Sequence, residues 1–191
     1  MQAVKYFRIL LAAAAVLVAL GCARGPTVFI NDEYNFQYVE RVAVVPFDNL
    51  TSDQGAGNRV TRVFIADLLA EKAFDIVEPG EVSRVLEKFS TVRTSQLTQE
   101  QITAIGQDLK VQGIIFGNVT EMTSSRSGSA MVNTVTLVIR MVETETGATV
   151  WSATNTSGGR GFWGALFGGG DKSESEAIRD CVKGAVKTLI K

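Results

Sequence analysis

The feature that most constrains this chain is a short apolar run near its N-terminus. Residues 9–20 are all apolar, and they follow a segment that contains Lys5 and Arg8 but no acidic residue. A helix that crosses a bilayer needs about 20 such residues, so this run of 12 is too short to span one. It has the length of the hydrophobic region of a secretory signal peptide. We therefore expect residues 1–21 to be a signal peptide that is removed from the mature chain.

The residues that close this run, Ala19-Leu20-Gly21-Cys22, resemble a lipobox, in which the cysteine receives lipid and becomes the mature N-terminus. The alternative is an ordinary secretory signal that ends beside a cysteine, but the order of charge, apolar run, small residue and cysteine favours lipidation of Cys22. Acyl chains such as palmitate hold a protein at a bilayer, because each buried methylene contributes about 0.8 kcal/mol. Ala23, rather than Asp, follows the cysteine, which implies the outer membrane and a periplasm-facing domain.

The composition excludes several classes of function. The sequence has no histidine, which excludes Ser-His and Cys-His catalysis and histidine metal sites. Without residues 1–21 the chain has 17 basic and 20 acidic residues and no basic block. We therefore expect no nucleic-acid partner, no metal or cofactor, and no enzymatic activity. Cys181 shares a helical face with apolar residues, which predicts a buried thiol.

Strand and helix patterns alternate along the mature chain. We expect helices at 58–72, from Pro79 to about 89, from Thr98, and at 172–190, and strands at 39–47, 74–77, 111–120, 134–142 and 148–156. Asn58 and a Thr98–Gln101 capping box are the expected helix starts, and Gly147 is the expected hairpin-turn glycine. The order β-α-β-α-α-β-β-β-α predicts an α/β (α+β) fold with a mixed sheet and packed helices.

We expect residues 22–38 to form a lipidated tether and residues 39–191 to form one periplasmic domain. The tether is unusually apolar for a spacer, since it contains Phe29, Ile30 and Tyr34. In an oligomer it would lie across a neighbouring subunit, whereas in a monomer it would cover the edge of its own sheet. We prefer the second interpretation.

Three segments together resemble the curli-secretion (CsgG-type) lipoprotein family. Residues 42–49 are similar to its opening strand and loop, residues 105–120 to its glycine-flanked strand, and residues 137–152 to its hairpin. The hairpin is also similar to that of the penicillin-binding-protein activators of the LpoB type, and the N-terminal domain of TolB shares the architecture. The resemblance covers residues 39–190 and implies a fold similar to the anticodon-binding domain.

Curli-secretion subunits insert two hairpins into the outer membrane, and each hairpin needs about 20 residues plus a turn. The corresponding segments here are residues 123–133, which are mostly polar, and residues 158–172, which contain seven glycines. Both are too short to cross a bilayer as a hairpin. We therefore expect a shortened relative that lacks the family's channel activity.

Two loops carry residues that attract functional interpretations. The first loop is residues 158–172. If exposed, its apolar side chains would contact a partner, a neighbouring subunit or the membrane interface, and otherwise they would pack on the core: Phe162, Trp163, Leu166 and Phe167. The adjoining residues 168–173 fail as a phosphate loop, because Asp171 stands where the motif requires glycine. Residues 48–53 would suit a cation or a partner, but turn chemistry explains them equally well and is preferred.

The leading hypothesis from sequence is a non-enzymatic, CsgG-like accessory of assembly or secretion that acts by protein–protein contact, as a monomer or as a homo-oligomer. The first alternative is an activator of a peptidoglycan synthase. The short distance between Cys22 and the fold counts against it, since about 16 residues span at most roughly 55 Å. The second alternative is an oligomeric outer-membrane secretion channel.

Overall fold

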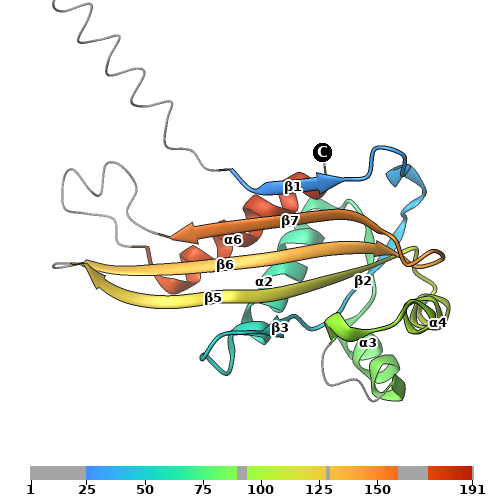
Figure 1. Cartoon of the computed structure of the whole chain (residues 1–191), viewed down its shortest axis with the longest axis horizontal. Coiled ribbons are helices and arrows are strands. Elements are labelled where there is room, and N and C mark those ends of the chain that lie inside the picture. Colours follow the sequence, from blue (N-terminus) through green and yellow to red (C-terminus); the bar gives the residue numbers. More distant parts are fainter. Residues whose placement is uncertain (1–24, 90–93, 128–129, 159–171, 191) are drawn as a thin grey trace, which may run out of the picture.

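A mixed sheet organises the molecule (Figure 1). This computed structural model describes residues 25–89, 94–127, 130–158 and 172–190. In these residues the sheet has seven strands: β1 (Thr27–Ile30), β2 (Arg41–Val44), β3 (Asp48–Asn49), β4 (Asp75–Ile76), β5 (Gly113–Ser127), β6 (Ala130–Glu143) and β7 (Thr149–Gly158). The helices of the same residues are α2 (Ala56–Glu71), α3 (Pro79–Leu86), α4 (Gln99–Leu109) and α6 (Glu174–Leu189), with short 3-10 turns η1 (Phe36–Tyr38), η2 (Glu87–Phe89) and η3 (Thr94–Gln96).

The strands lie in the order β1-β7-β6-β5-β2-β4, and β3 pairs with β5. β2 runs parallel to β4 and β5, and β3 runs parallel to β5, whereas β1, β5, β6 and β7 pair in antiparallel fashion. The expected α/β (α+β) class and the expected order of the major elements are therefore confirmed.

The sheet separates two hydrophobic clusters. The larger cluster includes Phe64 of α2, Trp151 of β7 and Val182 of α6, and in Figure 1 these two helices lie behind β5, β6 and β7. The smaller cluster includes Val82 of α3 and Ile105 of α4. The central strands supply both: residues 42 and 44 belong to the larger cluster, and residues 43 and 45 belong to the smaller one. This two-sided burial confirms the interpretation of the near-continuous apolar run in the first predicted strand.

The ends of the helices confirm one prediction and correct another. Thr98 and Gln101 form the expected capping box at the start of α4. Asn58 does not cap α2, because that helix begins at Ala56 after Gly55, without a side-chain cap. The preceding loop is already closed by its own side chains, since Asp53 accepts a hydrogen bond from the amide of Gly55. The helix therefore starts earlier than the sequence pattern indicated.

Three stretches of strand lie where the sequence predicted none, and the shortest is β3, which pairs with β5 inside the expected loop at residues 48–53. β5 and β6 continue through residues 121–127 and 130–133, and their exposed polar side chains bond across the hairpin, as Ser124 does to Asn133. β1 lies inside the expected tether, where it pairs antiparallel with β7 and so covers the edge of the chain's own sheet. The described part of the chain holds no helix with both the length and the apolarity required to cross a membrane.

Cys181 is the buried thiol that the sequence predicted. It is fully buried in α6, and its sulfur lies 3.2 Å from the carbonyl oxygen of Asn155. Burial raises the pKa of the thiol to about 12. This cysteine therefore belongs to the core and does not present a reactive thiolate at neutral pH.

Candidate partner-binding groove

Two adjoining hollows lie at the end of the sheet where β6 turns into β7. The first has a volume of about 550 Å³ and is lined by the β1–η1 connection and the β6–β7 turn. The second, of about 320 Å³, lies between this turn and α4. Both hollows are lined by Gln112, Glu143 and Glu145, so they adjoin at these residues. We call the two hollows together the acidic groove.

The β6–β7 turn holds Glu143 in a fixed position. Its carboxylate accepts hydrogen bonds from the amides of Glu145 (2.7 Å) and Thr146 (2.8 Å) and from the Thr146 hydroxyl (2.6 Å). Gly147 completes the turn with φ 71°, as its position in the sequence predicted. Partial burial of Glu143 disfavours its charge, but the three donated hydrogen bonds outweigh it and hold the pKa of the carboxyl below its usual value. Glu143 is therefore a charged and rigid part of the groove.

The turn is locked onto α4 through Thr144. The buried hydroxyl of Thr144 donates to the carbonyl of Val111 (2.8 Å), and the carbonyl of Thr144 accepts from the Thr103 hydroxyl (2.9 Å). Gly106 makes this close approach possible, because a Cβ built there would lie 2.5 Å from the Cβ of Thr144. The contact of Gly106 with Thr144, 38 positions apart in the sequence, thus sets the distance between α4 and the turn at the second hollow.

Aromatic side chains form the wall opposite the turn. Tyr34 packs edge to face against Phe36, with ring centroids 5.1 Å apart. Burial raises the pKa of Tyr34, and the negative charges of Glu143 and Glu145 raise it further. Tyr38 is 76% exposed at the same hollow. Large amphipathic rings beside charged groups are common in protein interfaces.

The charge of the groove is predominantly negative. Glu33, Glu143 and Glu145 line the two hollows, and among the described residues Lys110 is their one basic lining residue. The part of the chain that the structure describes contains no group of three or more side chains able to hold a metal ion. The groove is therefore suited to bind the cationic side chains of a protein partner.

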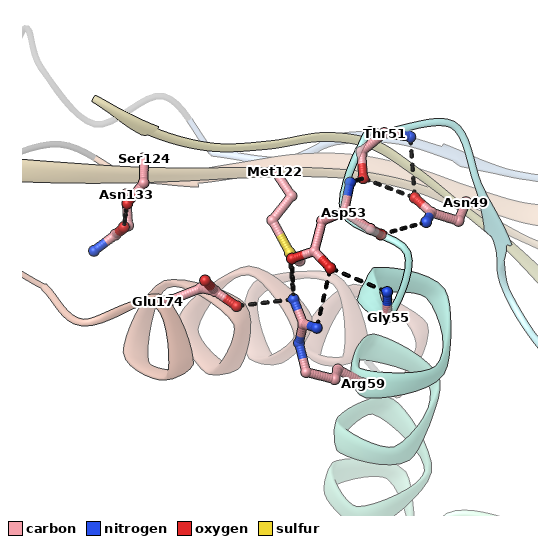
Figure 2. Close-up of polar contacts among 9 residues, drawn as sticks. All are labelled: Asn49, Thr51, Asp53, Gly55, Arg59, Met122, Ser124, Asn133 and Glu174. Atoms are coloured by element: carbon pink, nitrogen blue, oxygen red, sulfur yellow. Dashed lines mark hydrogen bonds and ion pairs between the residues drawn. The ribbon is translucent and has the colours of Figure 1, made fainter.

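A second polar cluster joins α2 to α6 (Figure 2). The guanidinium of Arg59 bonds to the carboxylate of Asp53 and, at 3.0 Å, to that of Glu174. Asn49 stabilises the loop that precedes α2 by accepting hydrogen bonds from the amide (3.0 Å) and hydroxyl (2.8 Å) of Thr51. The hydrogen bond to Arg59 lowers the pKa of Asp53, and the amide of Gly55 adds to this effect. These contacts are internal, so the preferred turn chemistry accounts for residues 49–53, while Asp48 and Asn49 also pair with β5 as strand β3.

The site residues predicted from sequence lie outside the described residues: Cys22, Phe162, Trp163, Leu166 and Phe167. The groove itself was not predicted. Its strongest sequence signal is the pattern Glu-Thr-Glu-Thr-Gly at residues 143–147, which was interpreted only as a hairpin turn. The aromatic residues of the opposite wall were assigned to the tether, and only the tertiary structure brings them to the turn.

Comparisons with known proteins give a family and a fold. No curated protein sequence matches the chain. Two solved structures with similar folds are the PelC dodecamer from Paraburkholderia phytofirmans (TM-score 0.59, 16% identity, covering 87% of this chain and 98% of that one) and lipoprotein GNA1162 from Neisseria meningitidis (TM-score 0.58, 18% identity, covering 78% and 97%). The comparisons do not support the curli-secretion assignment.

The family model described as peptidoglycan-synthase activator LpoB matches residues 26–156, a span that runs from the start of β1 almost to the end of β7. This span contains every described lining residue of the two hollows, whereas α6 lies outside it. Because the match covers well over half of the sequence, this chain belongs to the LpoB family of peptidoglycan-synthase activators.

Proposed function

We propose that this protein is a lipid-anchored activator of a peptidoglycan synthase at the outer membrane, and that its acidic groove binds the synthase. The family match over residues 26–156 carries this proposal, because that span contains every lining residue of the groove. The protein acts by contact and not by catalysis, in line with a family described as activators. The activator alternative therefore replaces the secretion accessory as the preferred function.

The negative charge of the groove defines the surface that it accepts. A synthase domain that presents lysine or arginine side chains would pair with Glu33 and Glu145, while Tyr34 and Tyr38 supply apolar contact area. Exposed ion pairs are screened by salt, so binding should weaken as ionic strength rises. No cofactor enters this mechanism.

The anchor and the remaining partner contacts belong to the same proposal. Cys22 is the lipidated residue of the mature chain, and the apolar side chains between β7 and α6 form a second contact: Phe162, Trp163, Leu166 and Phe167. Since β1 begins at Thr27, residues 23–26 alone separate Cys22 from the sheet, and the chain from Cys22 to Thr27 spans at most about 18 Å. The synthase must therefore reach the activator close to the outer membrane.

The proposal is tested with the synthase of the same cell envelope and a mature Cys22→Ser chain. This chain carries no lipid, so it can be assayed without detergent. We expect the chain to bind the synthase and to accelerate glycan polymerisation. Glu145→Lys should weaken binding by about tenfold, since reversing a charge against a basic surface costs on the order of 1–2 kcal/mol.

Glu121→Lys is the matched control, because Glu121 is an exposed residue of β5 in the hairpin half of the sheet, away from the groove. It should bind like the parent chain. Equal affinities for the two variants would exclude the groove as the binding site. Failure of the parent chain to bind or to stimulate any synthase of its envelope would overturn the activator function itself.

Homo-oligomerisation remains a second candidate mode of action, favoured by the similarity of the fold to PelC, which is a dodecamer. In that case the tested surface would contact a second copy of the chain. Light scattering of the lipidated protein in detergent separates the two modes, because an assembly would give a multiple of the monomer mass whether or not the synthase is present.

A further inference from the structure

β1 forms an edge of the sheet that exposes apolar side chains on both faces. It pairs with β7 on one side, and the described residues place no strand on its other side. The side chains of Val28, Phe29 and Ile30 are 37%, 52% and 43% exposed. By their register, Val28 and Ile30 share the face of Ala153 and Trp151, while Phe29 shares the opposite face with Ser152.

The two edges of the sheet differ in the way they are protected. At the other edge, Asp75 of β4 forms an ion pair with Arg41 (3.3 Å), and charges of this kind discourage pairing with another chain. β1 has the sequence Thr-Val-Phe-Ile, with no charged residue. An unprotected apolar edge in a folded domain indicates a surface that is covered in the working protein.

The length of chain before β1 identifies what covers it. Thr27 lies five residues after Cys22, and a fully extended chain of this length reaches about 18 Å. Phe29 is only two residues further along. If Cys22 carries lipid, this edge is the part of the described fold that is tied most closely to the bilayer.

The direction of β1 agrees with this placement. The strand starts beside Thr154 of β7 and runs toward the β6–β7 turn, where the amide of Asn31 bonds to the carbonyl of Val150 (2.9 Å). In Figure 1 the start of β1 lies away from that turn. The acidic groove is therefore at the end of β1 that is farther from the anchor.

We propose that the β1 edge rests on the membrane surface, with Val28, Phe29 and Ile30 in contact with the lipid head groups and the adjoining acyl chains. This inference rests on the proposed lipidation of Cys22, and it is independent of the synthase. The membrane contact fixes the orientation of the domain, with the groove beyond the end of β1 that is farther from Cys22. The unpaired backbone groups of β1 stay in the hydrated head-group layer, where water satisfies them.

The experiment uses the full lipidated chain in phosphatidylethanolamine–phosphatidylglycerol vesicles, with an environment-sensitive fluorophore on Phe29→Cys. Leu50→Cys is the matched control, because Leu50 is also 52% exposed but lies beside β5, three strands away from β1. Native Cys181 is fully buried and does not compete for the label. We expect lipids with a nitroxide on the head group to quench the Phe29→Cys label about threefold more than the Leu50→Cys label, since the interfacial layer is thin. Thr27→Cys, an exposed position on the same strand, replaces Phe29→Cys if that variant does not fold.

Each other result overturns the inference. Equal quenching at the two positions, with lipid on Cys22 shown by mass spectrometry, means that the protein is anchored but the edge is not at the membrane. Protection of the Phe29→Cys label from both the nitroxide lipid and aqueous iodide means that a second copy or a protein partner covers the edge. Absence of lipid on Cys22 removes the anchor and the inference together. None of these results affects binding of the synthase by the Cys22→Ser chain, so the two proposals fail separately.

Discussion

At the scale of single residues, Gly106 controls how closely α4 approaches the turn that carries Glu143 and Glu145. A methyl group there would lie 2.5 Å from the Cβ of Thr144, inside van der Waals contact. In a helix, replacing Gly by Ala ordinarily stabilises by up to about 1 kcal/mol. We predict the opposite for Gly106→Ala, a loss of about 1–3 kcal/mol, because overpacking pushes the helix away from the turn. Gly80→Ala in α3 is the control, since nothing lies within 4 Å of its Cβ position, and urea denaturation should show a stability equal to or above that of the parent. A Gly106→Ala chain as stable as the Gly80→Ala chain would contradict this account.

At the scale of elements, α6 depends on a capping box at its start. The hydroxyl of Ser173 accepts from the amide of Glu176 (3.3 Å), and the carboxylate of Glu176 accepts from the amide of Ser173 (2.8 Å). These bonds satisfy amides that the helix leaves unpaired, so Ser173→Ala should lower the free energy of unfolding by about 1 kcal/mol. Ser175→Ala changes an exposed serine in the same turn and should have little effect. Chemical denaturation followed by circular dichroism gives both values, and the prediction fails if the two variants lose the same stability.

The elements also show which parts of the fold can be predicted from sequence. Periodicity located the major helices and strands because their burial follows the spacing of apolar residues, as in β6, where Leu137 and Ile139 are fully buried and Val138 is not. β1 was not predicted, since its four residues gain their strand conformation only by pairing with β7. The hairpin beyond Glu121 was missed for a related reason, because cross-strand bonds between polar side chains leave no apolar pattern. The groove depends on the contact of Gly106 with Thr144, which no local pattern encodes.

At the scale of the whole molecule, the sheet makes two hydrophobic clusters into one cooperative unit. Ile105 of α4 and Trp151 of β7 are fully buried in different clusters, which meet through alternate residues of β2 and β5. We predict that Ile105→Val lowers the free energy of unfolding by about 0.5–1.5 kcal/mol. The unfolding midpoint should shift by the same amount with every spectroscopic probe. In a Trp163→Phe background Trp151 is the sole tryptophan, so its fluorescence reports the larger cluster while far-ultraviolet circular dichroism reports all helices. Val182→Ala, a change within the larger cluster, should shift both probes in the same way. If Ile105→Val moved the dichroism midpoint and left the Trp151 midpoint unchanged, the faces of the sheet would unfold independently, and the groove built on α4 could open without loss of the rest of the fold.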